Sequence, residues 1–164
     1  MKKSTFLLIG LVVNTILFSQ NFSISAKSGD TELDATLNDI NIKAKTDIKI
    51  FKNDMSVEFG VSGGKIDKLL IEKNMSPADV YMTYEIGRMT GKKDDDVLKV
   101  YDKSSSKGWG AMAKELGIKP GSPEFHALKG KAKKSKDKGN KAKKGGDGSR
   151  NGNGNGKGKG KGKK

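Results

Sequence analysis

Cysteine is absent from this chain of 164 residues, and histidine occurs once, as His126. The absence of cysteine excludes disulfide bonds, thiolate-ligated zinc, thiol catalysis and a lipid anchor attached to cysteine. A single histidine leaves little scope for a histidine-based metal or proton-transfer site. We therefore expect the packing of side chains, and no covalent or metal cross-link, to stabilise the fold.

A hydrophobic run of membrane-spanning length is also lacking. The run from Phe6 to Phe18 has 13 residues and is interrupted by Gly10, whereas a transmembrane helix needs about 20 apolar residues. Lys2-Lys3 precedes the run and Ser23-Ile24-Ser25-Ala26 follows it, an order typical of a secretory signal peptide. We predict a signal peptide over residues 1–26 and a secreted or periplasmic bacterial protein; a retained membrane anchor is the alternative.

Acidic and apolar residues are scarce at the other end of the chain. Residues 129–164 hold 14 Lys and Arg150 against two Asp, which amounts to +13 of the formal net charge of +14. Eleven of these residues are Gly, and the only apolar side chains are Ala132 and Ala142. Because this segment has almost nothing to bury in a core, it is predicted to be a disordered basic tail.

The middle of the chain carries the start and stop signals of helices. Ser76-Pro77 and Ser122-Pro123 each place a hydroxyl N-cap before a proline at the first helical position, and Asp94 begins a run of first-turn acids. Gly91 and Gly117 follow apolar stripes and are typical C-terminal stops. The sequence therefore predicts an all-α bundle of five or six short helices over residues 46–128.

The lead-in at residues 27–45 allows two interpretations. Ile40, Ile42 and Ala44 alternate as in a strand, whereas Leu33 and Leu37 join Ile40 and Ala44 in a helical stripe. A helix is favoured, because a lone strand would have no partner in this sequence.

One segment resembles a known group of sequences. Lys107-Gly108-Trp109-Gly110, followed by Leu116-Gly117-Ile118-Lys119-Pro120-Gly121-Ser122-Pro123-Glu124-Phe125-His126, resembles a family of uncharacterised secreted bacterial proteins. Members of that family resemble one another in having a helical region that ends in this segment, often before a Gly- and Lys-rich tail. The resemblance supports the domain boundaries and implies no activity.

Catalytic and metal-binding patterns are weak in this chain. We predict no catalytic residue, metal or cofactor, because there is no Gly-x-Ser-x-Gly elbow, phosphate-binding loop or calcium-loop spacing. One alternative is a small secreted enzyme with a site around His126, Glu124 and Trp109; a buried, structural Trp109 is favoured over an exposed stacking residue. Tyr81, Tyr84 and Tyr101 are likewise expected to line the core, with their hydroxyls at its edge. A second alternative is a helix-turn-helix-like nucleic-acid-binding module formed by residues 112–118 and the helix at Pro123.

The partition of charge favours a binding or structural protein that is not an enzyme. Residues 27–128 carry a formal charge of −1, so the tail is the only strong electrostatic feature after removal of the signal peptide. A flexible polycation attracts polyanions by counterion release, with envelope polysaccharide, anionic lipid and extracellular nucleic acid as candidates. The predicted contact residues are Lys133, Lys134, Lys143, Lys144, Arg150, Lys163 and Lys164. A solubilising tail with no specific partner is the alternative, and the helical domain is expected to contact an unidentified protein or glycan.

Overall fold

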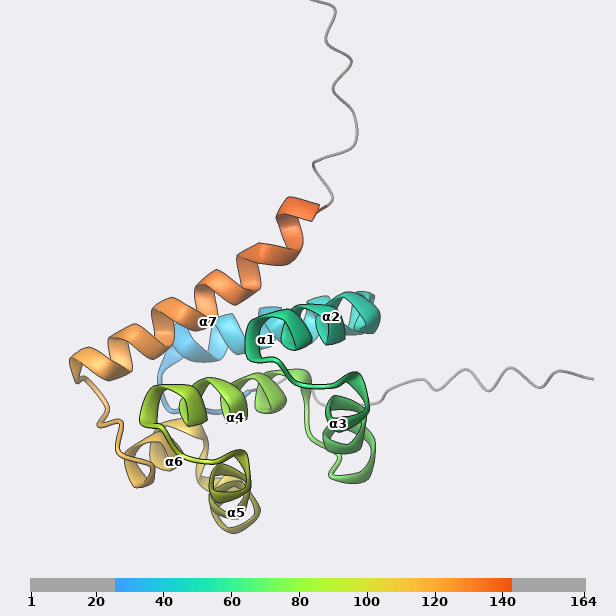
Figure 1. Cartoon of the computed structure of the whole chain (residues 1–164). Helices are drawn as coiled ribbons and strands as arrows, with labels where there is room; N and C mark the ends of the chain where they lie inside the picture. The colour runs from blue at the N-terminus through green and yellow to red at the C-terminus, as the bar shows by residue number, and fades with distance from the viewer. Residues whose placement is uncertain (1–25, 143–164) are drawn as a thin grey trace, which may run out of the picture.

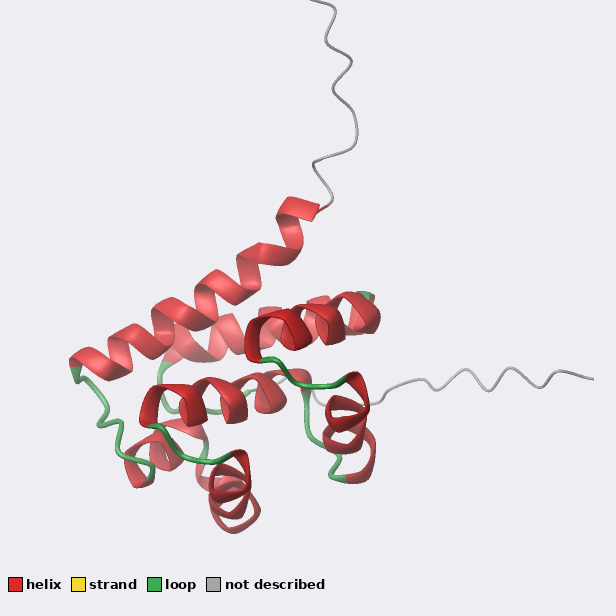
Figure 2. Ribbon diagram, in the orientation of Figure 1, coloured by secondary structure: helices red, strands yellow, loops and turns green. Residues whose placement is uncertain are grey.

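The computed structural model describes residues 26–142, and every regular element among them is helical (Figure 1 and Figure 2). The predicted all-α class is therefore confirmed, with seven α-helices in this part of the chain where five or six were expected. The predicted signal peptide over residues 1–26 lies outside the described residues except for Ala26, as does the predicted tail from residue 143 onward.

The helices follow one another with short connections. They are α1 (Thr31–Thr46), α2 (Ile48–Phe59), α3 (Gly63–Asp67), α4 (Pro77–Thr90), α5 (Asp94–Ser104), α6 (Trp109–Glu115) and α7 (Pro123–Ala142). A π-helical turn, η1 (Lys68–Glu72), continues α3, and a 3-10 turn, η2 (Ser105–Lys107), continues α5.

The predicted caps delimit α4 as expected. The Ser76 side chain accepts a hydrogen bond from the Asp79 amide, and the Asp79 carboxylate accepts one from the Ser76 amide, which completes a capping box. Pro77 occupies the first helical position, and Gly91 ends the helix with a left-handed φ of 67°. These local signals are independent of packing, which explains why the sequence was sufficient to place α4.

The ambiguous lead-in is a helix, as favoured. Leu33, Leu37, Ile40 and Ala44 of α1 are all buried, whereas Ile42 is 49% exposed. The helical stripe therefore faces the core and the alternating pattern does not. Asp30 begins the helix because its side chain accepts a hydrogen bond from the Leu33 amide at 2.9 Å.

Helix α4 lies at the centre of the bundle. Ten of its 14 residues are buried, and it contacts α1 on one side and α5 on another. Helix α1 in turn contacts α7, and α5 contacts α6, so that α7, α1, α4 and the α5–α6 pair succeed one another through the molecule (Figure 1). A buried side chain joins two of these helices, because Asn41 of α1 accepts a hydrogen bond from the Ala78 amide at 2.8 Å.

The residues just before α1 dock against the start of α6. The amides of Trp109 and Gly110 donate hydrogen bonds to the carbonyl oxygens of Lys27 and Ser28, at 3.1 and 2.8 Å. A Cβ atom at Gly108 or Gly110 would overlap with these same carbonyl oxygens. The two glycines that flank Trp109 are therefore required by a close backbone approach from a segment about 80 residues away in sequence.

The last helix is longer than predicted. Helix α7 extends to Ala142, so residues 129–142, which were predicted to belong to the disordered tail, are helical. Ala132 follows Leu128 by one turn, and both side chains are fully buried. A small apolar residue at the helical spacing, together with ion pairs to α1 and α2, is enough to extend the helix through a lysine-rich sequence.

Candidate functional site on the last helix

The lysines of α7 between residues 129 and 138 fall into two groups according to what they contact. Lys129 bridges Asp30 and Glu32 at the start of α1, with N–O distances of 3.2 and 2.8 Å. Further along the helix, Lys136 pairs with Asp39 and Lys138 pairs with Glu58, the latter at 3.0 Å.

These ion pairs change the pKa values of both partners. The hydrogen bond to Glu32 is the main reason why the pKa of Lys129 is raised, and the pairing with Asp39 raises that of Lys136. The same bond to Lys129 lowers the pKa of Glu32, whereas the pKa of Asp30 is lowered first by its hydrogen bond from the Leu33 amide and then by Lys129. The four acids of α1, α2 and the Asp30 cap thus neutralise three positive charges of α7.

The second group of lysines points into solvent. Lys131, Lys133 and Lys134 are exposed and make no ion pair within the described residues. Lys131 and Lys134 are three residues apart, so they are neighbours on the helix surface. We call these three residues the basic face of α7; their charges remain available to an anionic partner.

Two of the seven predicted polyanion contacts lie on this face. Lys133 and Lys134 are both exposed on α7, whereas Lys143, Lys144, Arg150, Lys163 and Lys164 lie outside the described residues. Lys131 was not predicted, because it has no lysine directly beside it in sequence and residues 129–164 were expected to be a flexible chain without helical spacing. The 3.6-residue period of α7 brings Lys131 next to Lys134.

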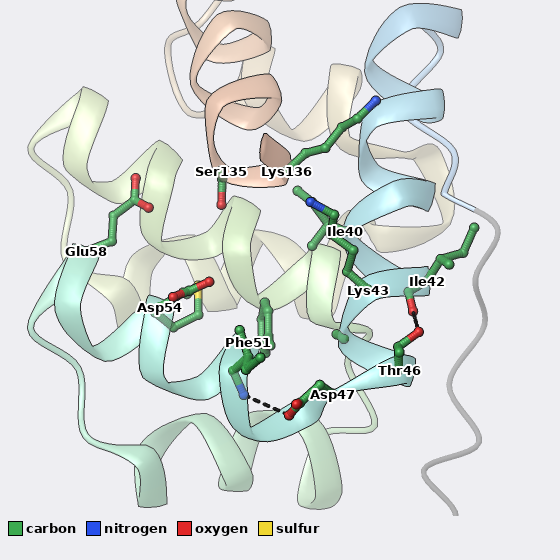
Figure 3. Close-up of a pocket in the computed structure, with 13 residues that line it drawn as sticks. Ile40, Ile42, Lys43, Thr46, Asp47, Phe51, Asp54, Glu58, Ser135 and Lys136 are labelled. Atoms are coloured by element: carbon green, nitrogen blue, oxygen red, sulfur yellow. Dashed lines mark hydrogen bonds between the residues drawn. The ribbon is translucent and has the colours of Figure 1, made fainter. Parts of the chain in front are cut away.

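A pocket of about 220 Å³ lies where α1, α2 and α7 meet (Figure 3). Its wall is largely apolar, with Ile40 and Ala44 from α1 and Phe51 and Met55 from α2. Ser135 and Lys136 of α7 line another side of it. We call this cavity the α1–α2–α7 pocket.

The charged side chains that line the α1–α2–α7 pocket include one from α1 and one from α2 on facing sides. Figure 3 shows Lys43 of α1 and Asp54 of α2 on facing sides. The Lys43 Nζ atom is buried and has no hydrogen-bond partner among the described residues. Desolvation raises the pKa of Asp54, although attraction from Lys138 and Lys43 partly opposes that effect. Both groups were missed from the sequence, because each stands alone in a run of mixed charge.

The three residues of the predicted enzyme alternative do not share one environment. His126 and Glu124 are exposed on the first turns of α7, whereas Trp109 is only 2% exposed and lies in the core. The favoured structural role of Trp109 is thus confirmed. Glu124 caps its own helix: hydrogen bonding to its own backbone amide and then to the Ser122 side chain lowers its pKa.

Trp109 is held in place by a shared acceptor. Its indole N–H donates to an Asp79 carboxylate oxygen at 2.7 Å, and the Tyr101 hydroxyl donates to the other oxygen at 3.1 Å. Burial raises the pKa of Tyr101, and the nearby Asp79 charge raises it further. This network joins α4, α5 and α6, and it pairs the polar atoms of the buried Trp109 and the partly buried Tyr101.

The tyrosines of α4 differ from the expected arrangement. Tyr81 and Tyr84 line the core as predicted, but their hydroxyls are buried and have no hydrogen-bond partner within the described residues. Burial raises the pKa of Tyr84 to about 12 and that of Tyr81 as well, with the Glu85 charge adding to the shift at Tyr81. The prediction that these hydroxyls lie at the edge of the core is therefore wrong.

The helix-turn-helix alternative involves α6 and α7. Phe125 and Leu128 in the first turns of α7 are buried, so this side of the helix packs on the core. The exposed positions there include Glu124, whose negative charge is unfavourable next to a phosphate backbone.

Residues 26–142 contain neither a cluster of metal ligands nor a membrane-spanning helix. No group of three or more His, Asp or Glu side chains there could hold a metal ion, and none of the helices described is both long and apolar enough to cross a bilayer. Comparison with family models, curated proteins and solved structures finds no match to this chain. The resemblance to secreted bacterial proteins stays a prediction.

Proposed function

We propose that this chain is a secreted helical binding or structural protein that associates with polyanions through the basic face of α7 and the basic residues that follow it. The observation that carries the proposal is the division of the α7 lysines. Acids of α1 and α2 neutralise Lys129, Lys136 and Lys138, while Lys131, Lys133 and Lys134 stay exposed. The helix therefore has one side for packing and another for an external anion.

The remaining sequence adds to this charge. Residues 143–164 hold seven Lys and Arg150 against a single acid, Asp147. A surface of closely spaced lysines binds phosphate or sulfate groups mainly by releasing condensed counterions, with little dependence on sequence or shape. Aromatic residues, which would add base stacking, are missing from residues 129–164. Envelope polysaccharide, anionic lipid and extracellular nucleic acid all fit this chemistry.

The salt dependence of binding tests the proposal. Affinity for heparin and for duplex DNA is measured at several salt concentrations for the full chain, for a chain ending at Ala142 and for the double variant Lys131→Gln/Lys134→Gln. We expect the logarithm of the DNA affinity to fall linearly with the logarithm of salt concentration, by about 0.9 for each phosphate contacted. The slope should be smaller by about two contacts in the double variant, and smaller still in the shortened chain.

A matched control separates the basic face of α7 from charge in general. Lys114 and Lys119 are exposed near α6 and make no ion pair within the described residues, so Lys114→Gln/Lys119→Gln removes the same charge elsewhere. This control should leave the slope unchanged. Equal slopes for the two double variants would exclude the basic face of α7, and a flat salt response of the full chain would exclude the polyanion mechanism.

A further inference from the structure

The α1–α2–α7 pocket contains an unusual ammonium group. A charge removed from water is costly unless it is paired or hydrogen-bonded. The Lys43 Nζ atom is buried without a hydrogen-bond partner among the described residues. Two lysines of the neighbouring helix α7 have partners instead: Lys136 pairs with Asp39 and Lys138 with Glu58. An anionic group bound in the pocket would supply the missing acceptor.

The other side of the pocket carries an acidic group, the Asp54 carboxylate. Asp54 makes no hydrogen bond or ion pair with any described residue, and Lys138 and Lys43 attract it only at longer range. The nearby Glu58 is already paired with Lys138, and Asp47 accepts hydrogen bonds from the amides of Lys49 and Ile50 at the start of α2. Asp54 is therefore the acid in the pocket that is left to bind a cation or a hydrogen-bond donor.

The space between these two groups suits an apolar body of modest size. The cavity of about 220 Å³ is larger than the 150 Å³ cavity that is known to accept benzene. Ile40, Phe51 and Met55 provide its walls, and the partly exposed Ile42 and Ile50 stand at its rim. A simple fatty acid would satisfy Lys43 but would place its negative charge near Asp54 without a counterion.

We infer that the α1–α2–α7 pocket binds a small zwitterion with an apolar body, such as an amino acid with a large hydrophobic side chain. Its carboxylate accepts a hydrogen bond from the Lys43 ammonium, its ammonium donates to the Asp54 carboxylate, and its side chain lies against Phe51 and Met55. This site is separate from the basic face of α7, which is on the solvent side of the same helix, and the inference does not depend on polyanion binding.

Three probes with the same phenyl group test the inference on the unmodified protein. L-Phenylalanine carries both charges, 3-phenylpropanoate only the carboxylate and phenethylamine only the ammonium. Binding is followed by titration calorimetry and by NMR shifts of the amides lining the pocket. We expect L-phenylalanine to bind at least tenfold more tightly than either analogue, because it alone pairs with both Lys43 and Asp54.

Single variants then assign each charge. Lys43→Met should reduce the affinity for L-phenylalanine to that for phenethylamine, and Asp54→Asn should reduce it to that for 3-phenylpropanoate. The matched controls are Lys45→Met, an exposed lysine in the last turn of α1, and Asp95→Asn, an exposed acid of α5; neither should alter binding. Thermal melting of each variant verifies that it is folded.

Several outcomes would overturn the inference. Equal affinity for the three probes would show an apolar cavity in which the charges have no role, and tighter binding of 3-phenylpropanoate than of L-phenylalanine would show an anion site. The absence of any NMR shift at the pocket amides with 20 mM L-phenylalanine would show that the pocket does not bind this class of ligand. A dissociation constant above 20 mM corresponds to less than about 2.3 kcal/mol of binding free energy. These probe experiments use the unmodified chain, so they remain decisive even if a variant does not fold.

Discussion

At the scale of single residues, the two glycines that flank Trp109 are required by a tertiary backbone contact. Both are needed because the carbonyl oxygens of Lys27 and Ser28 occupy the positions where a side chain would begin. Gly108 also has a left-handed φ of 81°, whereas Gly110 lies inside α6. At Gly110 a side chain is disfavoured only by the steric overlap with Ser28, and not by the backbone conformation. A substitution there therefore tests the docking of residues 27–28 more directly than one at Gly108.

We predict that Gly110→Ala lowers the free energy of unfolding by about 1 to 3 kcal/mol, the usual cost of overpacking. The new methyl group must displace the backbone of Ser28, which cannot move as easily as a side chain. Chemical denaturation measures the change. The control, Gly130→Ala in α7, introduces a Cβ into open space and should stabilise the protein by about 0.5 to 1 kcal/mol. A neutral Gly110→Ala would mean that residues 27–28 do not dock there.

At the scale of elements, α7 combines weak helix-forming residues with strong tertiary contacts. Gly130 and Gly139 each disfavour a helix by about 1 kcal/mol relative to alanine, and neighbouring lysines repel one another. Burial of Leu128 and Ala132 and the pairing of Lys129, Lys136 and Lys138 with acids of the bundle offset these effects. Helix α7 is therefore stable only while it is docked.

Shortening the chain tests this dependence. A chain ending at Ala142 should melt at the same temperature as the full chain. A chain ending at Leu128 should be less stable, because it lacks the buried Ala132 and the three ion-paired lysines. Circular dichroism during heating measures both, and the shorter chain should melt several degrees lower. Identical melting of the two shortened chains would show that residues 129–142 add nothing to the fold.

The docking of α7 should also weaken in acid. The pKa values of Asp30 and Glu32 are lowered from their ordinary values of 3.8 and 4.5, so both carboxyls bind protons more readily in the unfolded chain. Their stabilising effect is thus complete above about pH 5 and is lost as the pH falls through 4 and below. The raised pKa of Lys129 has no influence in this range, because lysine is protonated throughout.

Urea denaturation at pH 7 and at pH 3.5 measures this loss. Lys129→Met should reduce the difference in stability between the two pH values, because it removes the partner of both acids. Lys119→Met, at an exposed position with no ion pair in the described part of the chain, should leave the difference as it is. The same pH dependence in both variants would contradict a role for Lys129.

At the scale of the whole molecule, Ala26, the first described residue, lies next to the predicted cleavage site of the signal peptide. The Ala26 amide donates a hydrogen bond to the Asn38 side chain at 2.6 Å, and Ala26 packs against the core. Removal of a signal peptide after Ser25 would keep this residue and its nitrogen in the mature protein.

We accordingly predict a mature N-terminus at Ala26 or Lys27 in protein recovered from the periplasm or the culture medium. N-terminal sequencing measures it, and the docking of Ala26 favours the first of these positions. Protein found in the cytoplasm with Met1 in place would contradict the prediction. Substitution of Ser23 by a large residue should slow processing, because signal peptidases require small residues near the cleavage site.

The sequence by itself determined the all-α class and most of the helix ends before α7. Caps such as Ser76-Pro77, stops such as Gly91 and the apolar stripe of α1 act within a few residues, so their effect can be read without knowing the fold. The burial of Trp109 followed from the same helical spacing.

Only the tertiary structure decided which charges are free and how far α7 extends. Lys129 meets Asp30 and Glu32 across almost 100 positions of sequence, and Lys43 faces Asp54 only because α1 and α2 pack beneath α7. Helical spacing along α7 could have suggested Lys131, but not which lysines find acids. The physical reason is that ion pairing and desolvation depend on distance and burial in space, which local sequence patterns do not contain.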